Sequence, residues 1–145
     1  MPVYLPPPEN FLALQNSSCM ANDDALVVLL VDDSLLIIDR IIGLLDEVGN
    51  IRIIFQASSY SEAVGIVAEA EPDIVLMDIF LGGRISFDLL KFLGENYPSV
   101  ETAVISNHAG EHYRDICKKL GARHFFDKSN EFELLVNMMS GKKNR

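Results

Sequence analysis

The sequence predicts an α/β protein with a doubly wound parallel sheet of five strands. Short apolar runs rich in Val and Ile alternate five times with longer stretches in which apolar residues recur at helical spacing. The short runs are mainly apolar and do not alternate apolar with polar residues, which is typical of parallel strands covered by helices on both faces. A chain of 145 residues, 49% of them hydrophobic, can bury such a core in a single domain.

Five strand and helix pairs account for the chain from residue 25 onward. The expected strands are, in order, LVVLLV, IRIIFQA, DIVLM, TAVIS and RHFFD. The expected helices cover about residues 35–48, 60–69, 87–95, 111–120 and 130–139. Apolar positions 35, 38, 41, 42 and 45 lie on one face of the first helix. Gly49 and Asn50 end that helix, and Gly121 ends the fourth.

Capping residues mark the starts of two helices. Ser59 or Ser61, with Glu62 behind it, fits the start of the second helix. Ser129 or Asn130 fits the start of the last one. These side chains accept hydrogen bonds from the free amides of a first helical turn, so we expect the helices to begin there.

The chain divides into an N-terminal extension, residues 1–24, and a domain, residues 25–145. The extension holds three consecutive prolines and a polar stretch. We expect it to be loose or to lie against a surface. The chain ends in KKNR soon after the last helix. We therefore expect no separate output domain.

Composition argues against several classes of function. A net charge of −9 disfavours sequence-independent binding to DNA or RNA. The N-terminus has no basic start, and no apolar run is long enough to span a bilayer. The two cysteines form no CxxC pair, so neither a metal site nor a disulfide framework is indicated. We expect a soluble, cytoplasmic protein that does not bind nucleic acid directly.

Polar residues gather where the predicted strands end. In open parallel sheets, ligands bind beyond the carboxyl ends of the strands. The residues at those ends are Asp32 and Asp33, Asp78, Ser106 and Asn107, and Asp127 and Lys128. Although they are far apart in sequence, such a fold brings them to one edge.

Three carboxylates and a lysine at one edge form a site of hard oxygen ligands that suits Mg²⁺. The ion would relieve the repulsion between the adjacent Asp32 and Asp33. Because Mg²⁺ favours sites shared with phosphate oxygens, we expect a phosphoryl group as its companion. An aspartate there can act as a nucleophile and become an aspartyl phosphate. Ser106 and Lys128 could hold the oxygens of that phosphate.

From about residue 26 to 140 the chain resembles the receiver domain of bacterial response regulators, the CheY-like superfamily, in its single-domain type. The motifs are LLVDDS, PDIVLMDIFL, AVIS and GARHFFDKS, in the order of the family. The resemblance implies a flavodoxin-like (βα)5 fold with strand order 2-1-3-4-5.

The resemblance also assigns roles to residues. Asp78 matches the phosphoacceptor, and Asp32, Asp33, Asp78 and the backbone carbonyl of Phe80 match the Mg²⁺ ligands. Ser106 matches the switch hydroxyl, Lys128 the family's lysine, and Phe125 the aromatic switch position. Phe125 lacks a hydroxyl, so any switching there would act through packing.

The expected function is that of a response-regulator receiver in a two-component phosphorelay. It would accept a phosphoryl group on Asp78 from a sensor histidine kinase or a phosphotransfer protein. It would pass the signal to a downstream protein target by contact, and a homodimer is one expected assembly. Such a domain is not an enzyme beyond its own phosphorylation and dephosphorylation.

The sequence departs from the family at several positions around the acceptor. Gly82 replaces the usual proline, and Ser86 replaces a glycine, so we expect a loop with more backbone freedom after Asp78. Ser129 stands where proline commonly follows the lysine. Asn107 occupies a place that is usually small, which would narrow access to the acceptor.

Two other functions remain open at this point. A pseudo-receiver would use the same face as a binding module without phosphorylation. Asn107, Phe80 and the missing proline leave room for this alternative. A phosphatase of the haloacid dehalogenase type also uses an aspartate at a strand end. Those enzymes place a second acid two residues on, where this chain has Phe80.

Overall fold

The computed structural model describes residues 3–5 and 25–142. Its strands are β1 (Val3–Leu5), β2 (Leu26–Val31), β3 (Ile51–Ala57), β4 (Ile74–Met77), β5 (Phe80–Leu81), β6 (Arg84–Ile85), β7 (Glu101–Ser106) and β8 (His124–Asp127). Its helices are α2 (Leu35–Leu45), α3 (Tyr60–Ala70), α4 (Asp88–Asn96), α5 (Glu111–Lys119) and α6 (Phe132–Ser140). Each of the five predicted strand and helix pairs is present.

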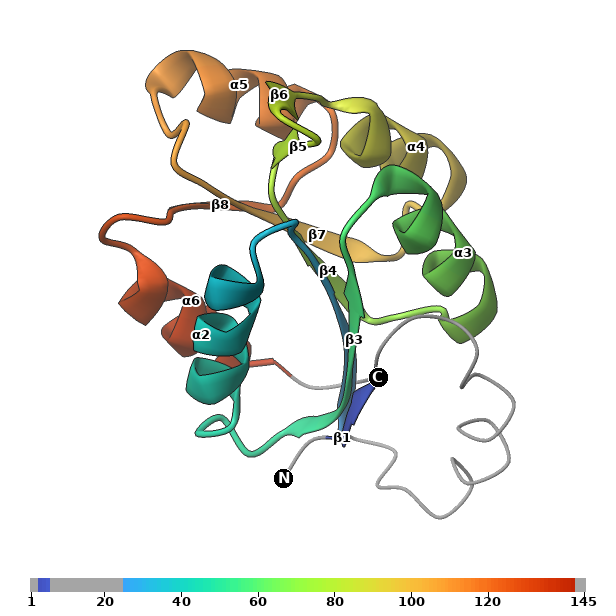
Figure 1. Cartoon of the computed structure of the whole chain (residues 1–145), viewed down its shortest axis with the longest axis vertical. Helices are drawn as coiled ribbons and strands as arrows, with labels where there is room; N and C mark the ends of the chain where they lie inside the picture. Colours follow the sequence, from blue (N-terminus) through green and yellow to red (C-terminus); the bar gives the residue numbers. More distant parts are fainter. Residues whose placement is uncertain (1–2, 6–24, 143–145) are drawn as a thin grey trace.

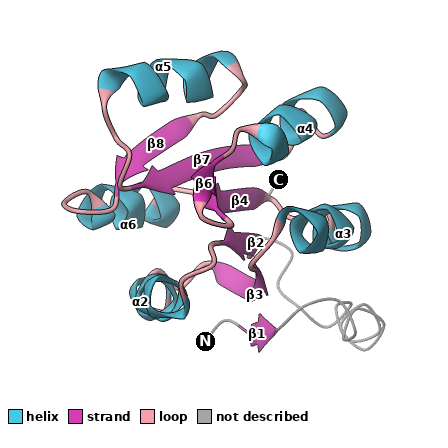
Figure 2. Cartoon of the chain, turned by 45° about the horizontal axis from the view of Figure 1, so that its top comes forward, coloured by secondary structure: helices cyan, strands magenta, loops and turns pink. Residues whose placement is uncertain are grey.

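The main sheet is parallel and has the order β1-β3-β2-β4-β7-β8, as Figure 2 shows. Five of these strands reproduce the predicted order 2-1-3-4-5, which confirms the fold class. The sheet has one strand more than predicted, because residues of the extension form β1 at its edge. Val3 pairs with Ile53 and Leu5 with Phe55. This strand covers backbone groups of β3 that an open edge would leave unpaired.

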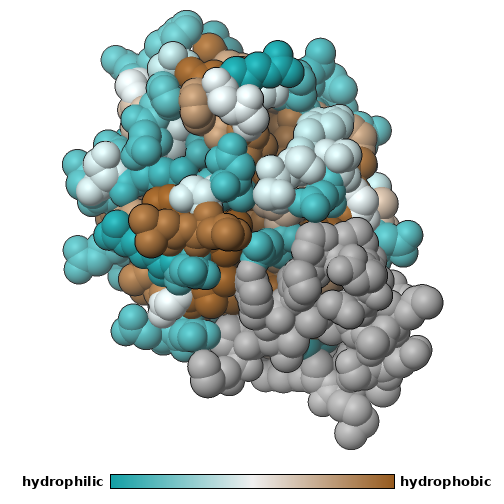
Figure 3. Space-filling view, viewed as in Figure 1, coloured by the Kyte–Doolittle hydropathy of each residue, from teal (hydrophilic) through white to brown (hydrophobic). Residues whose placement is uncertain are grey.

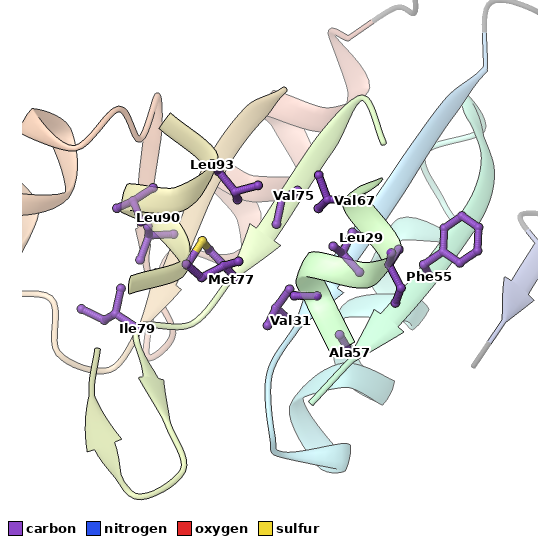
Figure 4. Close-up of a cluster of buried hydrophobic side chains, with 14 of the residues drawn as sticks. Leu29, Val31, Phe55, Ala57, Val67, Val75, Met77, Ile79, Leu90 and Leu93 are labelled. Atoms are coloured by element: carbon purple, nitrogen blue, oxygen red, sulfur yellow. The ribbon is translucent and has the colours of Figure 1, made fainter. Parts of the chain in front are cut away.

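Helices cover both faces of the sheet (Figure 1). α2 and α6 lie on one face, and α3, α4 and α5 lie on the other. Successive residues of β2 point to opposite faces, so Leu29 packs with α3 and α4 while Leu30 packs with α2 and α6. Figure 4 shows part of the cluster on the face covered by α3, α4 and α5, including Val75 and Met77 of β4. This double burial explains why the central strands β2 and β4 are apolar at every position.

The observed helix ends test the predicted caps. Ser59 caps α3, since its hydroxyl accepts a hydrogen bond from the amide of Glu62 at 3.2 Å. The cap predicted for the last helix is wrong: α6 begins after Glu131 and has no side-chain cap. Residues 127–131 form a turn instead, because the carbonyl of Asp127 accepts bonds from the amides of Asn130 and Glu131.

Gly94 lies inside α4 where no side chain fits. A Cβ at this position would lie 2.6 Å from the carbonyl oxygen of Leu120, which follows α5. We expect Gly94→Ala to lower the free energy of unfolding by about 1–3 kcal/mol, although alanine itself favours helix. Gly43→Ala in α2 is the control, since nothing lies within 4 Å of its added Cβ. It should stabilise by about 0.5–1 kcal/mol. Urea unfolding curves that moved in the same direction for both variants would contradict this.

None of the helices within residues 25–142 has the length and apolar character needed to cross a bilayer.

Candidate functional site

The predicted site residues lie at the carboxyl edge of the sheet. Asp32 and Asp33 follow β2, and Asp78 follows β4. Ser106 ends β7, and Lys128 follows β8. Because parallel strands end at the same edge, residues that are up to 96 positions apart in sequence come together. Four of the five are buried, with exposed fractions of 4% for Asp32, 5% for Asp78, 0% for Ser106 and 7% for Lys128.

Lys128 joins the two buried acids. Its Nζ lies 2.7 Å from Oδ2 of Asp32 and 2.7 Å from Oδ2 of Asp78. Burial lowers the pKa of the ammonium, but its hydrogen bonds to both acids outweigh this, and the pKa of Lys128 is raised. Burial raises the pKa of Asp32, and the bond to Lys128 offsets this only in part. Ionised Asp32 therefore carries an energetic cost in the folded protein.

Backbone amides orient the three carboxylates. Oδ1 of Asp32 accepts a hydrogen bond from the amide of Ser34 at 2.9 Å. Oδ1 of Asp78 accepts one from the amide of Phe80 at 3.0 Å. Asp33 is exposed, and its Oδ2 accepts a bond from the amide of Gly82 at 3.1 Å. Each acid is thus fixed through one oxygen by the loop that follows a strand.

Residues 80–85 form a β-hairpin rather than the freer loop expected after Asp78. Phe80 pairs with Ile85, and Leu81 pairs with Arg84. The two residues of the turn, Gly82 and Gly83, both have positive φ (65° and 80°). This backbone is the type I′ turn that favours glycine at both positions. The Gly-Gly pair between two short apolar runs was the sequence signal for this hairpin.

Ser106 ends β7, next to the strand β4 that Asp78 follows, but its hydroxyl bonds locally. Its hydroxyl oxygen accepts a hydrogen bond from the amide of His108 at 3.0 Å, and the structure gives it no bond to Asp78 within residues 25–142. The ring of His108 stacks on that of Phe80, with 5.2 Å between centroids and 21° between planes. Asn107 itself is exposed. Phe80 and His108 each follow a predicted site residue by two positions, so their stacked rings lie next to the site.

Phe125, the predicted aromatic switch residue, lies beneath a guanidinium that sequence reasoning missed. The Arg114 guanidinium carbon is 4.9 Å from the centre of the Phe125 ring, and Nη1 donates to the carbonyl oxygen of Phe125 at 3.3 Å. Nη2 of Arg114 forms an ion pair with Glu131 at 2.9 Å. Arg114 therefore ties together α5, β8 and the start of α6. No local sequence pattern indicates such a contact.

An apolar surface adjoins the site. Leu35 and Leu36, in the first turn of α2, are 68% and 78% exposed. Figure 3 shows the apolar area that α2 contributes to this face of the molecule. Exposed leucines beside a buried ionic centre are suited to contact with another protein.

The three acids were expected to share a metal, and their chemistry fits one only in part. Asp32, Asp33 and Asp78 together with the one ammonium of Lys128 carry two formal negative charges, on hard oxygen donors suited to Mg²⁺. However, within the described residues no three His, Cys, Asp or Glu side chains are arranged to hold an ion. Lys128 engages two of the acids, and the hairpin engages the third. The donor set fits Mg²⁺, but its oxygens are turned to protein partners.

Comparison with known proteins decides the family. Residues 28–140 match the response regulator receiver domain family. The chain belongs to this family. Receiver domains are signalling domains of two-component systems, they generally bind Mg²⁺, and they interact with kinases and downstream targets. The match leaves no support for the phosphatase alternative.

Several curated relatives of the receiver domain are described as transcriptional regulatory proteins. YesN of Bacillus subtilis is 27% identical over 113 residues, covering 77% of this chain and 31% of its own. DegU of Brevibacillus brevis is 24% identical over 115 residues, covering 79% of this chain and 49% of its own. The chain thus spans about half the length of these relatives or less.

Solved structures share the fold at low sequence identity. The response regulator domain of Thermotoga maritima CheB has a TM-score of 0.68 at 21% identity, covering 79% of this chain and 90% of that one. The receiver domain of a Luxo repressor protein from Vibrio parahaemolyticus has a TM-score of 0.69 at 18% identity, covering 80% and 90%. These similarities support the fold alone.

Proposed function

We propose that this receiver domain accepts one phosphoryl group on Asp78, with Mg²⁺ held by Asp32, Asp33, Asp78 and the backbone carbonyl of Phe80. The observation that carries this proposal is the position of Lys128, whose ammonium bonds the buried carboxylates at the ends of β2 and β4. A cation fixed between two acids is poised to receive the oxygens of an incoming phosphoryl group.

Asp78 is the nucleophile in this reaction. One of its carboxylate oxygens attacks the phosphorus of the donor, and the bond from phosphorus to the leaving group breaks, with its electron pair going to that group. When bound, Mg²⁺ supplies positive charge to the phosphoryl oxygens. Lys128 and Ser106 provide the protein's own contacts to those oxygens. Ser106 is free to do so once its hydroxyl turns from the amide of His108.

The signal then passes through the face made by α5, β8 and α6. Phe125 lies on this face under Arg114, so a change in its packing would alter the contacts of all three elements. We propose that the phosphoryl donor is a sensor histidine kinase or a phosphotransfer protein, and that the output is contact with a downstream protein in the cytoplasm or a homodimer. Direct binding to nucleic acid by this chain is not part of the proposal.

Intact-mass measurement after treatment with a small phosphodonor and Mg²⁺ tests the proposal. The wild-type chain should gain the mass of one phosphoryl group. Asp78→Asn should gain none, because an amide is not a nucleophile of this kind. Asp115→Asn on the exposed face of α5 is the matched control and should label like wild type. Equal labelling of Asp78→Asn would refute the assignment of the acceptor.

A pseudo-receiver is the second candidate, favoured by one observation. Lys128 already satisfies both buried acids without a metal ion. In that case Mg²⁺ and a phosphate mimic such as beryllofluoride would not strengthen each other's binding. The proposed receiver predicts that each ligand tightens the other, because they share the same carboxylates.

A further inference from the structure

A cavity of about 350 Å³ opens beside the ion-pair centre and shares Asp78 with it. It is lined by Asp78, by Ser58 and Ser59 at the start of α3, by Arg84 and by Ser86. Leu81 and Gly82 complete the side formed by the β5–β6 hairpin. A cavity of this volume falls in the range of small-molecule sites.

Arg84 contributes one positive charge to a cavity that Asp78 and Asp88 also line. Within residues 25–142 the structure assigns the exposed Arg84 no carboxylate partner. Asp88 also lines the cavity, but it lies in the first turn of α4, where helix amides favour a carboxylate. The guanidinium therefore remains available to a second anion. A guanidinium can bind a planar carboxylate by donating two parallel hydrogen bonds to its oxygens.

The hairpin holds Arg84 in a defined position relative to Asp78. Arg84 pairs with Leu81 across the Gly82–Gly83 turn, and the amide of Gly82 is bonded to Asp33 at 3.1 Å. The turn is thus anchored to one of the acids that line the site. Figure 1 shows the hairpin close to the start of α4, at the edge where the central strands end. A two-residue turn of this kind is among the tighter connections that a chain can make.

We propose that the cavity binds the non-transferred part of a small acyl phosphate, and that Arg84 recognises a second carboxylate on that part. This inference rests on the proposed phosphorylation of Asp78 and names the class of small donor that the site prefers. An oxygen of Asp78 forms the new bond to phosphorus, and the bond from phosphorus to the acyl oxygen breaks. The electron pair leaves with the acyl group, which departs as a dicarboxylate. Its far carboxylate lies against Arg84.

Two donors with the same carbon skeleton test this specificity. Fumaroyl phosphate carries a free carboxylate where crotonoyl phosphate carries a methyl group. Intact-mass measurement in the presence of Mg²⁺ gives the rate at which each donor labels Asp78. The rate with fumaroyl phosphate divided by the rate with crotonoyl phosphate is the donor ratio. A general change in the reactivity of Asp78 affects both rates and cancels in this ratio. We expect the donor ratio to be about two- to five-fold higher for the wild type than for Arg84→Gln, because an exposed pair of opposite charges contributes only modestly to binding free energy.

Control variants separate a local site from a general effect of charge. Arg84→Lys should retain part of the preference. Arg123→Gln removes an exposed arginine, with 62% of its side chain accessible, far from the cavity lining, and should keep the wild-type ratio. An unchanged ratio in Arg84→Gln, or an equal fall in Arg123→Gln, would overturn the inference.

Phosphoramidate, which has no acyl group, distinguishes this failure from failure of the proposed function. It should label wild type and Arg84→Gln at equal rates. If phosphoramidate labels the wild type but the donor ratio does not depend on Arg84, only the specificity inference fails. If no donor labels the wild type, the acceptor assignment fails, and the inference that rests on it fails too.

Discussion

Replacing Lys128 with methionine is expected to lower the free energy of unfolding by about 3–5 kcal/mol at neutral pH. The change leaves the buried carboxylates of Asp32 and Asp78 without the ammonium that lies 2.7 Å from each. The pKa of Asp32 is already raised by burial, and it should rise further in the variant. Urea unfolding at pH 7 measures the loss.

The pH dependence of this loss has a definite sign. A folded-state pKa above the ordinary value of 3.8 means that ionised Asp32 costs stability at neutral pH. The cost disappears as the pH falls through the folded pKa toward 3.8. The destabilisation by Lys128→Met should therefore shrink on acidification. Lys118→Met on the exposed side of α5 is the control and should stay within about 0.5 kcal/mol of wild type. Similar losses in both variants would contradict the buried ion-pair account.

Asp33→Asn is expected to slow Mg²⁺-dependent labelling of Asp78 at least about ten-fold at limiting Mg²⁺, while leaving the fold intact. Asp33 is exposed, and its recorded hydrogen bond is to the amide of Gly82, which asparagine can also satisfy. We therefore expect a change in unfolding free energy within about 0.5 kcal/mol. Labelling rates across a series of Mg²⁺ concentrations test the first effect, and urea unfolding tests the second.

Asp39 provides the control for the Asp33→Asn prediction. Asp39 is exposed on α2 and lies outside the site. Asp39→Asn carries the same change of charge and should label like wild type. If both variants slowed equally, long-range charge would explain the effect. If neither slowed, Asp33 would not be a metal ligand.

Patterns within single strands and helices predicted the fold and the central ion-pair partners. Buried parallel strands leave continuous apolar runs, and the residues that follow them must meet at one edge of the sheet. This geometry brought Asp32, Asp78 and Lys128 together as predicted. Ser106 also lies at this edge. Its hydroxyl accepts a hydrogen bond from the amide of His108, so its role as a switch hydroxyl stays a prediction from the resemblance.

Features that depend on tertiary contacts were not predictable in the same way. The three-residue strand β1 lies among prolines, and only an open edge of β3 makes it a strand. The guanidinium of Arg114 covers Phe125 through a contact between α5 and β8, which leaves no periodic signal. The Gly82–Gly83 hairpin is different, because its turn signal is local. Taken alone, Gly82 is interpreted as a source of backbone freedom, whereas the glycine pair forms a tight turn.

The proposed function requires acids from the ends of β2 and β4 to share one Mg²⁺ at the edge where Lys128 lies. Three backbone amides should respond directly to an ion bound there. The amides of Ser34, Phe80 and Gly82 donate hydrogen bonds to the carboxylates of Asp32, Asp78 and Asp33, respectively. In an NMR titration of the ¹⁵N-labelled chain with Mg²⁺, we expect these three signals to move together along a single saturable curve. Signals that stayed in place, or that saturated only around Glu101 at the other end of the sheet, would contradict it.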